Sequence, residues 1–320
     1  MPLRTFLALC TALFSLPAFA QSWPAKPVKI VVAFSAGGGT DIVARAVAQK
    51  LGEFWSQSVI VDNRVGAGGM IGADMVAKSP ADGYTLLMAS PAEIALNHHL
   101  YKNISYNPEK DFAPITLVAI TPLVVAVYPG LPVKNIQELI ALAKEKPGTL
   151  GFATPGTASA QHLTGEMIQA AAGIKLVHVP YKGAGQSIPD VMGGQVPIGI
   201  YGALTISQQA KAGKLRVLAV TTPKRSSSAP DWPTLAESGF PGFDTSLWFG
   251  LLAPAATPKD IVGKIHDDTV RALKQPDVAE RIAAQGADIV GDTPAEFAAF
   301  IAAESAKYAA VIRQAGVKLE

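Results

Sequence analysis

The chain has 320 residues, of which 49% are hydrophobic and 16% charged, and its formal net charge is +2 at pH 7. Length and composition are those of a globular protein with room for two domains, each with its own core, and they exclude a disordered or coiled-coil chain. The lysines and arginines are scattered, without a basic stripe interleaved with aromatic residues, so no nucleic-acid partner is expected.

The first 20 residues have the features of a secretory signal peptide. Arg4 supplies a positive charge, residues 6–16 form an apolar core, and Ala-Phe-Ala at 18–20 is a cleavage site. A membrane anchor is the alternative, but the apolar run is short for a bilayer and Pro17 interrupts it. Cleavage after Ala20 would remove Cys10, the only cysteine, so we expect a soluble mature protein without disulfides or thiol chemistry.

The mature chain is organised around a strand, a glycine turn and a helix start. An apolar, β-branched run from Val28 ends at Phe34, residues 35–39 read SAGGG, and Thr40-Asp41 open a helical pattern. Glycines allow a close approach of the backbone, and the first N–H groups of a helix point toward a ligand with the positive end of the helix dipole behind them. This stretch therefore predicts an anion site.

The residues around these glycines narrow the choice of anion. A phosphate-binding P-loop would need Lys-Ser/Thr where Thr40-Asp41 stand, and a dinucleotide fingerprint would need a third glycine at Ile42. Asp41 would repel a phosphate dianion unless it turned away, for example to pair with Arg45 four residues later. A small carboxylate held by backbone amides is the favoured ligand, and a tight turn without any ligand is the alternative.

Strands and helices then alternate along the first part of the chain. Strands are expected at 59–61 and 85–88, and helices at 70–78 and about 93–100. Two further strands, 115–120 and 123–128, are expected with only Thr121-Pro122 between them. Such alternation predicts a parallel sheet covered by helices on both faces.

A second series of similar units begins at Leu131. Asn135 and Glu138 form a capping box that starts a helix. After a strand at 150–153, residues 154–159 repeat the order strand, small polar loop and helix. Further strands are expected at 175–179, 196–200, 215–220 and 247–252, and helices at 185–192 and 206–211 and from residues 257, 276 and 293. Ligands of α/β sheets bind at the carboxyl ends of strands, where residues 37–40, Ser90 and 157–159 fall, so a cleft between two lobes is expected.

Nine short segments of the chain resemble segments of one protein family and occur in the same order along the chain. They are WPAKP (23–27), AFSAGGGTD (33–41), DNRVGAGG (62–69), IGAD (71–74), DGYTLL (82–87), YNP (106–108), KDFAPI (110–115), VPYKG (179–183) and GGQV (193–196). The chain resembles the Bug family, the extracytoplasmic solute-binding receptors of tripartite tricarboxylate transporters. The likeness covers nearly the whole mature chain.

The resemblance implies an α/β, two-lobed periplasmic-binding-protein type II fold, also called a Venus flytrap. Residues 21–123 and 240–320 would form lobe I, residues 124–239 lobe II, and the first crossover would lie near 120–123. Implied too are a periplasmic monomer, a small carboxylate ligand, and membrane permease subunits or a signalling partner. No catalytic residue, metal or cofactor is expected. The implied ligand-binding residues are Phe34, Ser35, Gly37, Gly38, Gly39, Thr40, Asp41, Ser90, Thr154, Ser159, Tyr181, Lys182, Gly183 and Tyr201.

Departures from the family pattern bear on ligand identity. Tyr201 stands where an aspartate often faces the ligand, so an amino acid with its ammonium group is a less suitable ligand than a dicarboxylate, tricarboxylate or aromatic acid. Ala153 and Ala158 replace family glycines in the second loop. Neither loop contains an arginine, so no bidentate clamp is expected.

A secreted hydrolase or transferase on the same bilobal fold is the alternative function. Ser159 and His162 are the only nucleophile and base close in sequence, and they lack an obvious orienting acid. His162 is more readily explained as a capping or core-edge residue. His98 and His99 are adjacent, so they do not present a metal pair on one helical face.

Overall fold

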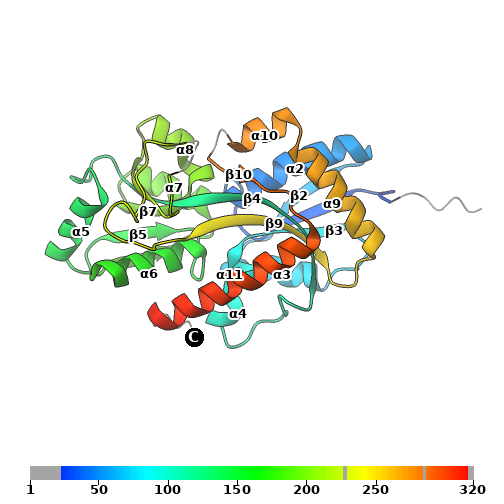
Figure 1. The fold of residues 1–320 in the computed structure, drawn as a ribbon, viewed down its shortest axis with the longest axis horizontal. Helices are drawn as coiled ribbons and strands as arrows, with labels where there is room; N and C mark the ends of the chain where they lie inside the picture. The colour runs from blue at the N-terminus through cyan, green and yellow to red at the C-terminus, as the bar shows by residue number, and fades with distance from the viewer. Residues whose placement is uncertain (1–22, 226–228, 284–285, 316–320) are drawn as a thin grey trace, which may run out of the picture.

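The computed structural model describes residues 23–225, 229–283 and 286–315. The signal-peptide prediction for residues 1–20 therefore lies outside the described residues. Within the described ranges, none of the helices combines the length and the hydropathy needed to cross a bilayer. The fold has two lobes, which lie to the right and the left in Figure 1 and are connected by two long strands, β4 and β9.

The first lobe is built on a mixed sheet with the strand order β2-β1-β3-β9-β4. Strand β1 (Val28–Val32) pairs in parallel with β2 (Val59–Asn63) and β3 (Thr85–Ala89). Strand β9 (Ser246–Pro254) is antiparallel to both β3 and β4. The parallel pairing predicted from the alternation of strands and helices is confirmed for β1, β2 and β3, whereas β9 and β4 make the complete sheet mixed.

Strand β4 (Phe112–Val127) is continuous, which corrects the expectation of two strands separated by Thr121-Pro122. Pro122 lies opposite Ser246 of β9, and the next residue, Leu123, lies opposite Gly202 of β7 (Ile198–Gly202). An extended backbone accommodates proline at the cost of one N–H donor, so the ladder continues on either side. β4 thus changes its partner at this point and passes from one lobe to the other.

The second lobe adds two strands, β7 and β8 (Arg216–Val220), that are antiparallel to β4, and two more strands, β5 (Gly151–Thr154) and β6 (Val177–Pro180), that are parallel to β7. Strands β5, β6 and β7 follow the order β7-β5-β6. The predicted capping box is confirmed, since Asn135 Oδ1 accepts the Glu138 N–H at 2.9 Å. The helices of this lobe are α5 (Ile136–Glu145), α6 (Ala160–Ala172), α7 (Ala184–Met192) and α8 (Ala203–Lys211).

The remaining elements cover the first lobe. They are α2 (Gly39–Trp55), the 3₁₀ turn η1 (Ala67–Gly69), α3 (Met70–Ala77), the π-helical segment η2 (Ala92–Leu96), α4 (Asn97–Leu100), α9 (Lys259–Leu273), α10 (Pro276–Ala283), β10 (Asp288–Ile289) and α11 (Pro294–Ala315). Helix α11 runs beneath both lobes in Figure 1 and packs on η2 and α4 of the first lobe and on α6 of the second.

The two lobes have separate hydrophobic cores. Val31, Leu87 and Phe249 belong to the first core, and Val125, Phe152 and Ile200 belong to the second. Between them, Thr221 accepts the Leu123 N–H at 3.2 Å and donates its hydroxyl to the Thr245 carbonyl oxygen at 2.6 Å. These hydrogen bonds join the segments that pass from one lobe to the other. The cleft lies between the two lobes.

Candidate functional site

The glycine loop after β1 presents an uncapped helix N-terminus. Gly38 is the N-cap residue of α2 and provides no side-chain cap, so the N–H groups of Gly39 and Thr40 lack an intrahelical acceptor. Gly37 adopts a φ of +78°, which glycine tolerates without strain. The loop therefore aims free donors and the positive end of the helix dipole at one point.

Asp41 is turned away from that point, as the spacing to Arg45 predicted. Its carboxylate accepts hydrogen bonds from Arg45 Nε at 2.9 Å, Gly37 N–H at 3.0 Å and Asn63 Nδ2 at 3.0 Å. Burial alone would raise the pKa of Asp41, but these hydrogen bonds and the Arg45 charge together hold it below its ordinary value. Asp41 thus fastens the loop to α2 and to β2.

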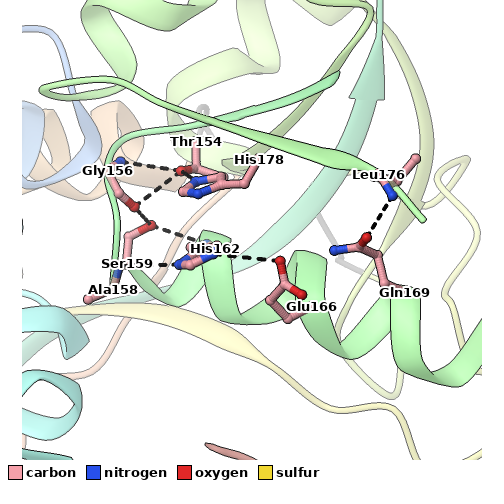
Figure 2. Close-up of polar contacts among 9 residues, drawn as sticks. All are labelled: Thr154, Gly156, Ala158, Ser159, His162, Glu166, Gln169, Leu176 and His178. Carbon is pink, nitrogen blue, oxygen red and sulfur yellow. Dashed lines mark hydrogen bonds and ion pairs between the residues drawn. The ribbon is translucent and has the colours of Figure 1, made fainter. Parts of the chain in front are cut away.

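The loop after β5 provides a second helix N-terminus. Ser159 caps α6, since its hydroxyl oxygen accepts the His162 N–H at 3.1 Å and donates to the Gly156 carbonyl oxygen at 2.7 Å (Figure 2). This cap satisfies the N–H of His162, the third residue of the helix. The N–H groups of Ala160 and Gln161, which line the inner cavity, remain without an intrahelical acceptor.

Two histidines support this second loop from inside the lobe. The rings of His162 and His178 are stacked with their centroids 3.8 Å apart, and His178 Nε2 lies 2.7 Å from Thr154 Oγ1 (Figure 2). His162 Nδ1 accepts the N–H of Ala158, which holds the left-handed φ of +63°. Burial, and then the neighbouring His162, lower the pKa of His178 to about 3, so His178 is neutral at physiological pH. The pair is structural.

The same contacts argue against catalysis by Ser159 and His162. The Ser159 hydroxyl is bonded to the backbone of Gly156 and His162, whereas the His162 ring faces Ala158 and, at 3.6 Å, Glu166 (Figure 2). A nucleophile needs a base that contacts its hydroxyl. Within the described residues, no group of three or more histidine, cysteine or acidic side chains is arranged to hold a metal ion.

A third polar group comes from the end of β3. Ser90 follows this strand directly, and its N–H and hydroxyl contact Glu93 Oε1 at 2.9 Å and Oε2 at 2.7 Å. Glu93 is fully buried, and burial raises its pKa to about 7 despite the hydrogen bonds from Ser90. The sequence analysis nominated Ser90 and did not identify Glu93.

The lobes touch on either side of the cleft. A Cβ atom added at Gly183 would lie 2.8 Å from Ser35 Cβ and 2.9 Å from Ser35 N. One added at Gly68 would lie 3.0 Å from the Thr157 carbonyl oxygen. Side chains at these glycines would therefore prevent the lobes from approaching as closely as they do.

Two cavities lie between the loops. The inner cavity has a volume of about 30 Å³ and is lined by Phe34, Gly38, Gly39, Thr40, Ser90, Ala92, Pro155, Ser159, Ala160, Gln161, Ala184, Thr205 and Leu247. The outer cavity has a volume of about 670 Å³ and is lined by Phe34, Gly66, Ala67, Gly68, Gly69, Tyr101, Pro155, Gly156, Thr157, Pro180, Tyr181, Lys182 and Gln186. Phe34 and Pro155 line both, so the cavities adjoin.

The structure brings most of the nominated residues to this cleft. Those lining the inner cavity are Phe34, Gly38, Gly39, Thr40, Ser90 and Ser159, and those lining the outer cavity are Tyr181 and Lys182. Ser35 and Gly183 form the contact between the lobes.

Besides Ser35 and Gly183, four nominated residues lie outside the two linings. Gly37 and Asp41 bond to each other behind the glycine loop, and Thr154 bonds to His178. Tyr201 is fully buried in the core of the second lobe, beside Ala153 and Ile188.

The sequence analysis missed the glycine turn at 66–69 as part of the cleft. The signal is present in the sequence, because four small residues after a strand are sufficient for a loop that a ligand can approach. Gln161 and Thr205 were missed too, because their place in the cleft depends on helix packing. Among the lining residues of both cavities Lys182 is the one charged side chain, and none is acidic.

A family model and a sequence relative match this chain over most of its length. Residues 43–317 match the model of the tripartite tricarboxylate transporter family receptor. Protein BugT of Bordetella pertussis (strain Tohama I) is 39% identical over 313 residues, which cover 98% of this chain and 96% of BugT.

Two solved structures, one with adipate and one with malate, are similar over nearly their full length. Rpa4515 of R. palustris with adipate is 35% identical, with a TM-score of 0.90 over 92% of this chain and 98% of that one. MatC (Rpa3494) from Rhodopseudomonas palustris with bound malate is 28% identical, with a TM-score of 0.87 over 91% of this chain and 100% of that one.

Proposed function

Because the chain belongs to the tripartite tricarboxylate transporter receptor family, a family of solute-binding receptors and not of enzymes, we propose a specific version of that role. The protein captures a dicarboxylate, tricarboxylate or aromatic carboxylate between its lobes. It then delivers this ligand to the membrane subunits of a tripartite tricarboxylate transporter or to a signalling partner.

The observation that carries the proposal is the inner cavity. Its wall contains the N-termini of α2 and α6, with the free N–H groups of Gly39, Thr40, Ala160 and Gln161. A volume of about 30 Å³ corresponds to about two water-sized groups, which suits the two oxygens of one carboxylate. Two helix dipoles and backbone donors stabilise such an anion without an arginine.

The outer cavity supports the preference among carboxylates. Its Lys182 is placed to attract a second negative group, and no acidic side chain lines either cavity to hold an ammonium group. Tyr201 is not part of this argument, because it is fully buried and lines neither cavity. The adipate and malate named in the titles of the two related structures are dicarboxylates.

The remaining parts of the proposal concern location and motion. The protein is a periplasmic monomer, exported by a signal peptide at residues 1–20. Residues 21–123 and 240–320 form one lobe and residues 124–239 the other, and the lobes close on the ligand. Each lobe supplies only part of the hydrogen-bond shell of the carboxylate, so the closed state binds it better and is favoured when ligand is present.

Thermal unfolding of refolded protein tests the proposal. The panel contains malate, adipate, citrate, benzoate, acetate and aspartate, each up to millimolar concentration. A ligand at 100 times its Kd adds about 2.7 kcal/mol of stability, which raises Tm by about 5 °C for a chain of this size. A shift with di- or tricarboxylates or benzoate and none with aspartate is expected. No shift with any acid would refute the carboxylate assignment.

A further inference from the structure

We propose that capture of the ligand carboxylate is coupled to the protonation of Glu93, which frees the Ser90 hydroxyl to donate a hydrogen bond to the ligand. This inference rests on the proposed function, because it concerns the same inner cavity. It adds a proton as a second ligand of the receptor.

The geometry places Glu93 directly behind the cleft. Ser90 lines the inner cavity and is 4% exposed, and Glu93 Oε2 lies 2.7 Å from the Ser90 hydroxyl oxygen. On its other side, a Cβ atom added at Gly69, which lines the outer cavity, would lie 3.3 Å from the same Oε2. The carboxyl group is therefore covered by one residue from each cavity wall.

An ionised Glu93 and a ligand carboxylate compete for one hydrogen. Ionised carboxylates are acceptors only, and a serine hydroxyl has a single hydrogen to donate. While Glu93 is ionised, that hydrogen is engaged at Oε2, and the Ser90 hydroxyl presents lone pairs to the cavity. When Glu93 takes a proton from solvent, its own O–H donates to Ser90 Oγ, and the Ser90 hydrogen turns to the ligand.

Charge favours the same outcome. A buried carboxylate without a cation is expensive, and a second carboxylate nearby makes ionisation of the first still less favourable. No ion pair among the described residues involves Glu93, and burial raises its pKa to about 7 even without ligand. Ligand binding should therefore shift Glu93 further toward its neutral form.

The other titratable groups around η2 have partners of their own or are buried. Four elements pack on η2, and two of them, η1 and β3, carry no titratable side chain. The third, α4, carries His98 and His99. Burial lowers the pKa of both histidines, that of His98 to about 4. Helix α11 carries Glu296, which bonds to Thr293, and Arg313 in its last turn. It also carries Glu304 and Lys307, which pair with each other, and Tyr308, whose pKa is raised by burial. Nearby, Tyr106 donates to the Glu93 carbonyl oxygen, and Asp74 pairs with Lys78. The Glu93 variant and its control therefore assign a change between pH 6 and 8 to Glu93 or to another group.

Isothermal titration of the mature protein with malate and adipate between pH 6 and 8 tests the coupling. If only the Glu93-protonated form binds, Kd rises about tenfold from pH 6 to pH 8, in proportion to the loss of that form around pH 7. Titrations at pH 7.5 in buffers of different ionisation enthalpy should show net proton uptake on binding.

Three variants sharpen the test. In Glu93→Gln, the amide group can still donate to Ser90 Oγ and accept the Ser90 N–H. The Kd of this variant should therefore be independent of pH, and at pH 8 it should be about tenfold lower than the Kd of the native protein. Ser90→Ala should weaken binding at pH 6 and reduce the pH dependence to the part that charge repulsion between Glu93 and the ligand contributes. Asp292→Asn is the matched control, since burial also raises the pKa of Asp292, which lies outside both cavity linings, and it should keep the native pH profile.

The outcomes separate this inference from the proposed function. A native Kd that does not change with pH, with no proton uptake, would refute the coupling and leave the carboxylate receptor standing. The same holds if Glu93→Gln retains the native pH profile. If no acid of the thermal panel binds at pH 6, the proposed function and the coupling both fail. Should Glu93→Gln not fold, the proton uptake of the native protein decides.

Discussion

Gly183 is the position where a single methyl group should separate ligand capture from folding. It lies on the second lobe with a φ of +144°, and a Cβ atom there would lie 2.8 Å from Ser35 Cβ and 2.9 Å from Ser35 N of the first lobe. Rotation of the Ser35 side chain relieves neither contact, because both atoms are attached directly to the Ser35 Cα or are part of the backbone. Opening of the lobes relieves both.

Gly183→Ala should therefore destabilise the closed state selectively. Overpacking of this kind costs about 1–3 kcal/mol, which corresponds to an increase in Kd of about 5- to 150-fold at about 1.4 kcal/mol per tenfold. The unfavourable φ affects open and closed states alike and should lower the free energy of unfolding as well. Calorimetric titration with malate and adipate measures the first effect, and denaturant unfolding without ligand measures the second.

Gly173→Ala is the matched control for Gly183→Ala. Gly173 also has a positive φ, of +62°, but an added Cβ would meet no atom within 4 Å. This variant should lose about 1 kcal/mol of stability and keep the native Kd. Small-angle scattering should show that saturating ligand compacts the Gly173→Ala protein and not the Gly183→Ala protein. A Gly183→Ala protein that binds within twofold of the native Kd would refute the closure argument.

Three further substitutions test the loops. Asp41→Asn should lower the free energy of unfolding by about 1–3 kcal/mol at pH 7 by breaking the bonds to Arg45 and Gly37. Because the pKa of Asp41 is lower in the folded state than in the unfolded state, ionised Asp41 stabilises the fold above its ordinary pKa, and this stabilisation is lost as pH falls through the folded-state pKa. In urea unfolding, the difference in free energy of unfolding between native protein and Asp41→Asn should therefore shrink below about pH 4. Ser159→Ala should cost about 1 kcal/mol through the α6 cap and weaken binding of malate and adipate; unchanged affinity, or turnover of an acyl ester, would count against the receptor assignment. Lys182→Gln should raise the Kd for malate about two- to fivefold at low salt and leave the Kd for acetate unaltered. Equal effects on both acids would show that Lys182 does not recognise a second carboxylate.

Much of the local structure near the cleft could be predicted from the sequence. The strand-glycine-helix order at 28–41, the capping box of Asn135 and Glu138, and the pairing of Asp41 with Arg45 all depend on residues within four positions of each other. Such contacts follow from backbone geometry and helix periodicity, which the sequence displays directly. The nominated residues at the ends of β1, β3 and β5 were found because strand ends are visible in the sequence as well.

The parts that sequence reasoning missed depend on distant segments. Neighbouring residues around Thr121-Pro122 suggested a break, whereas pairing with β9, more than 120 residues later, keeps β4 continuous. Tyr201 was nominated from its alignment with a ligand-facing aspartate, but it is buried against the core of the second lobe.

The sequence by itself therefore determined local features such as the glycine turn at 35–39 and the capping box of Asn135 and Glu138, and it predicted a carboxylate site. Only the tertiary structure decided which turns meet across the cleft, which residues line it, and that the carboxyl group of Glu93 lies behind Ser90. The physical reason is that burial and the position of a charge relative to a ligand are set by packing between segments far apart in the chain, whereas propensities and capping act within a few residues.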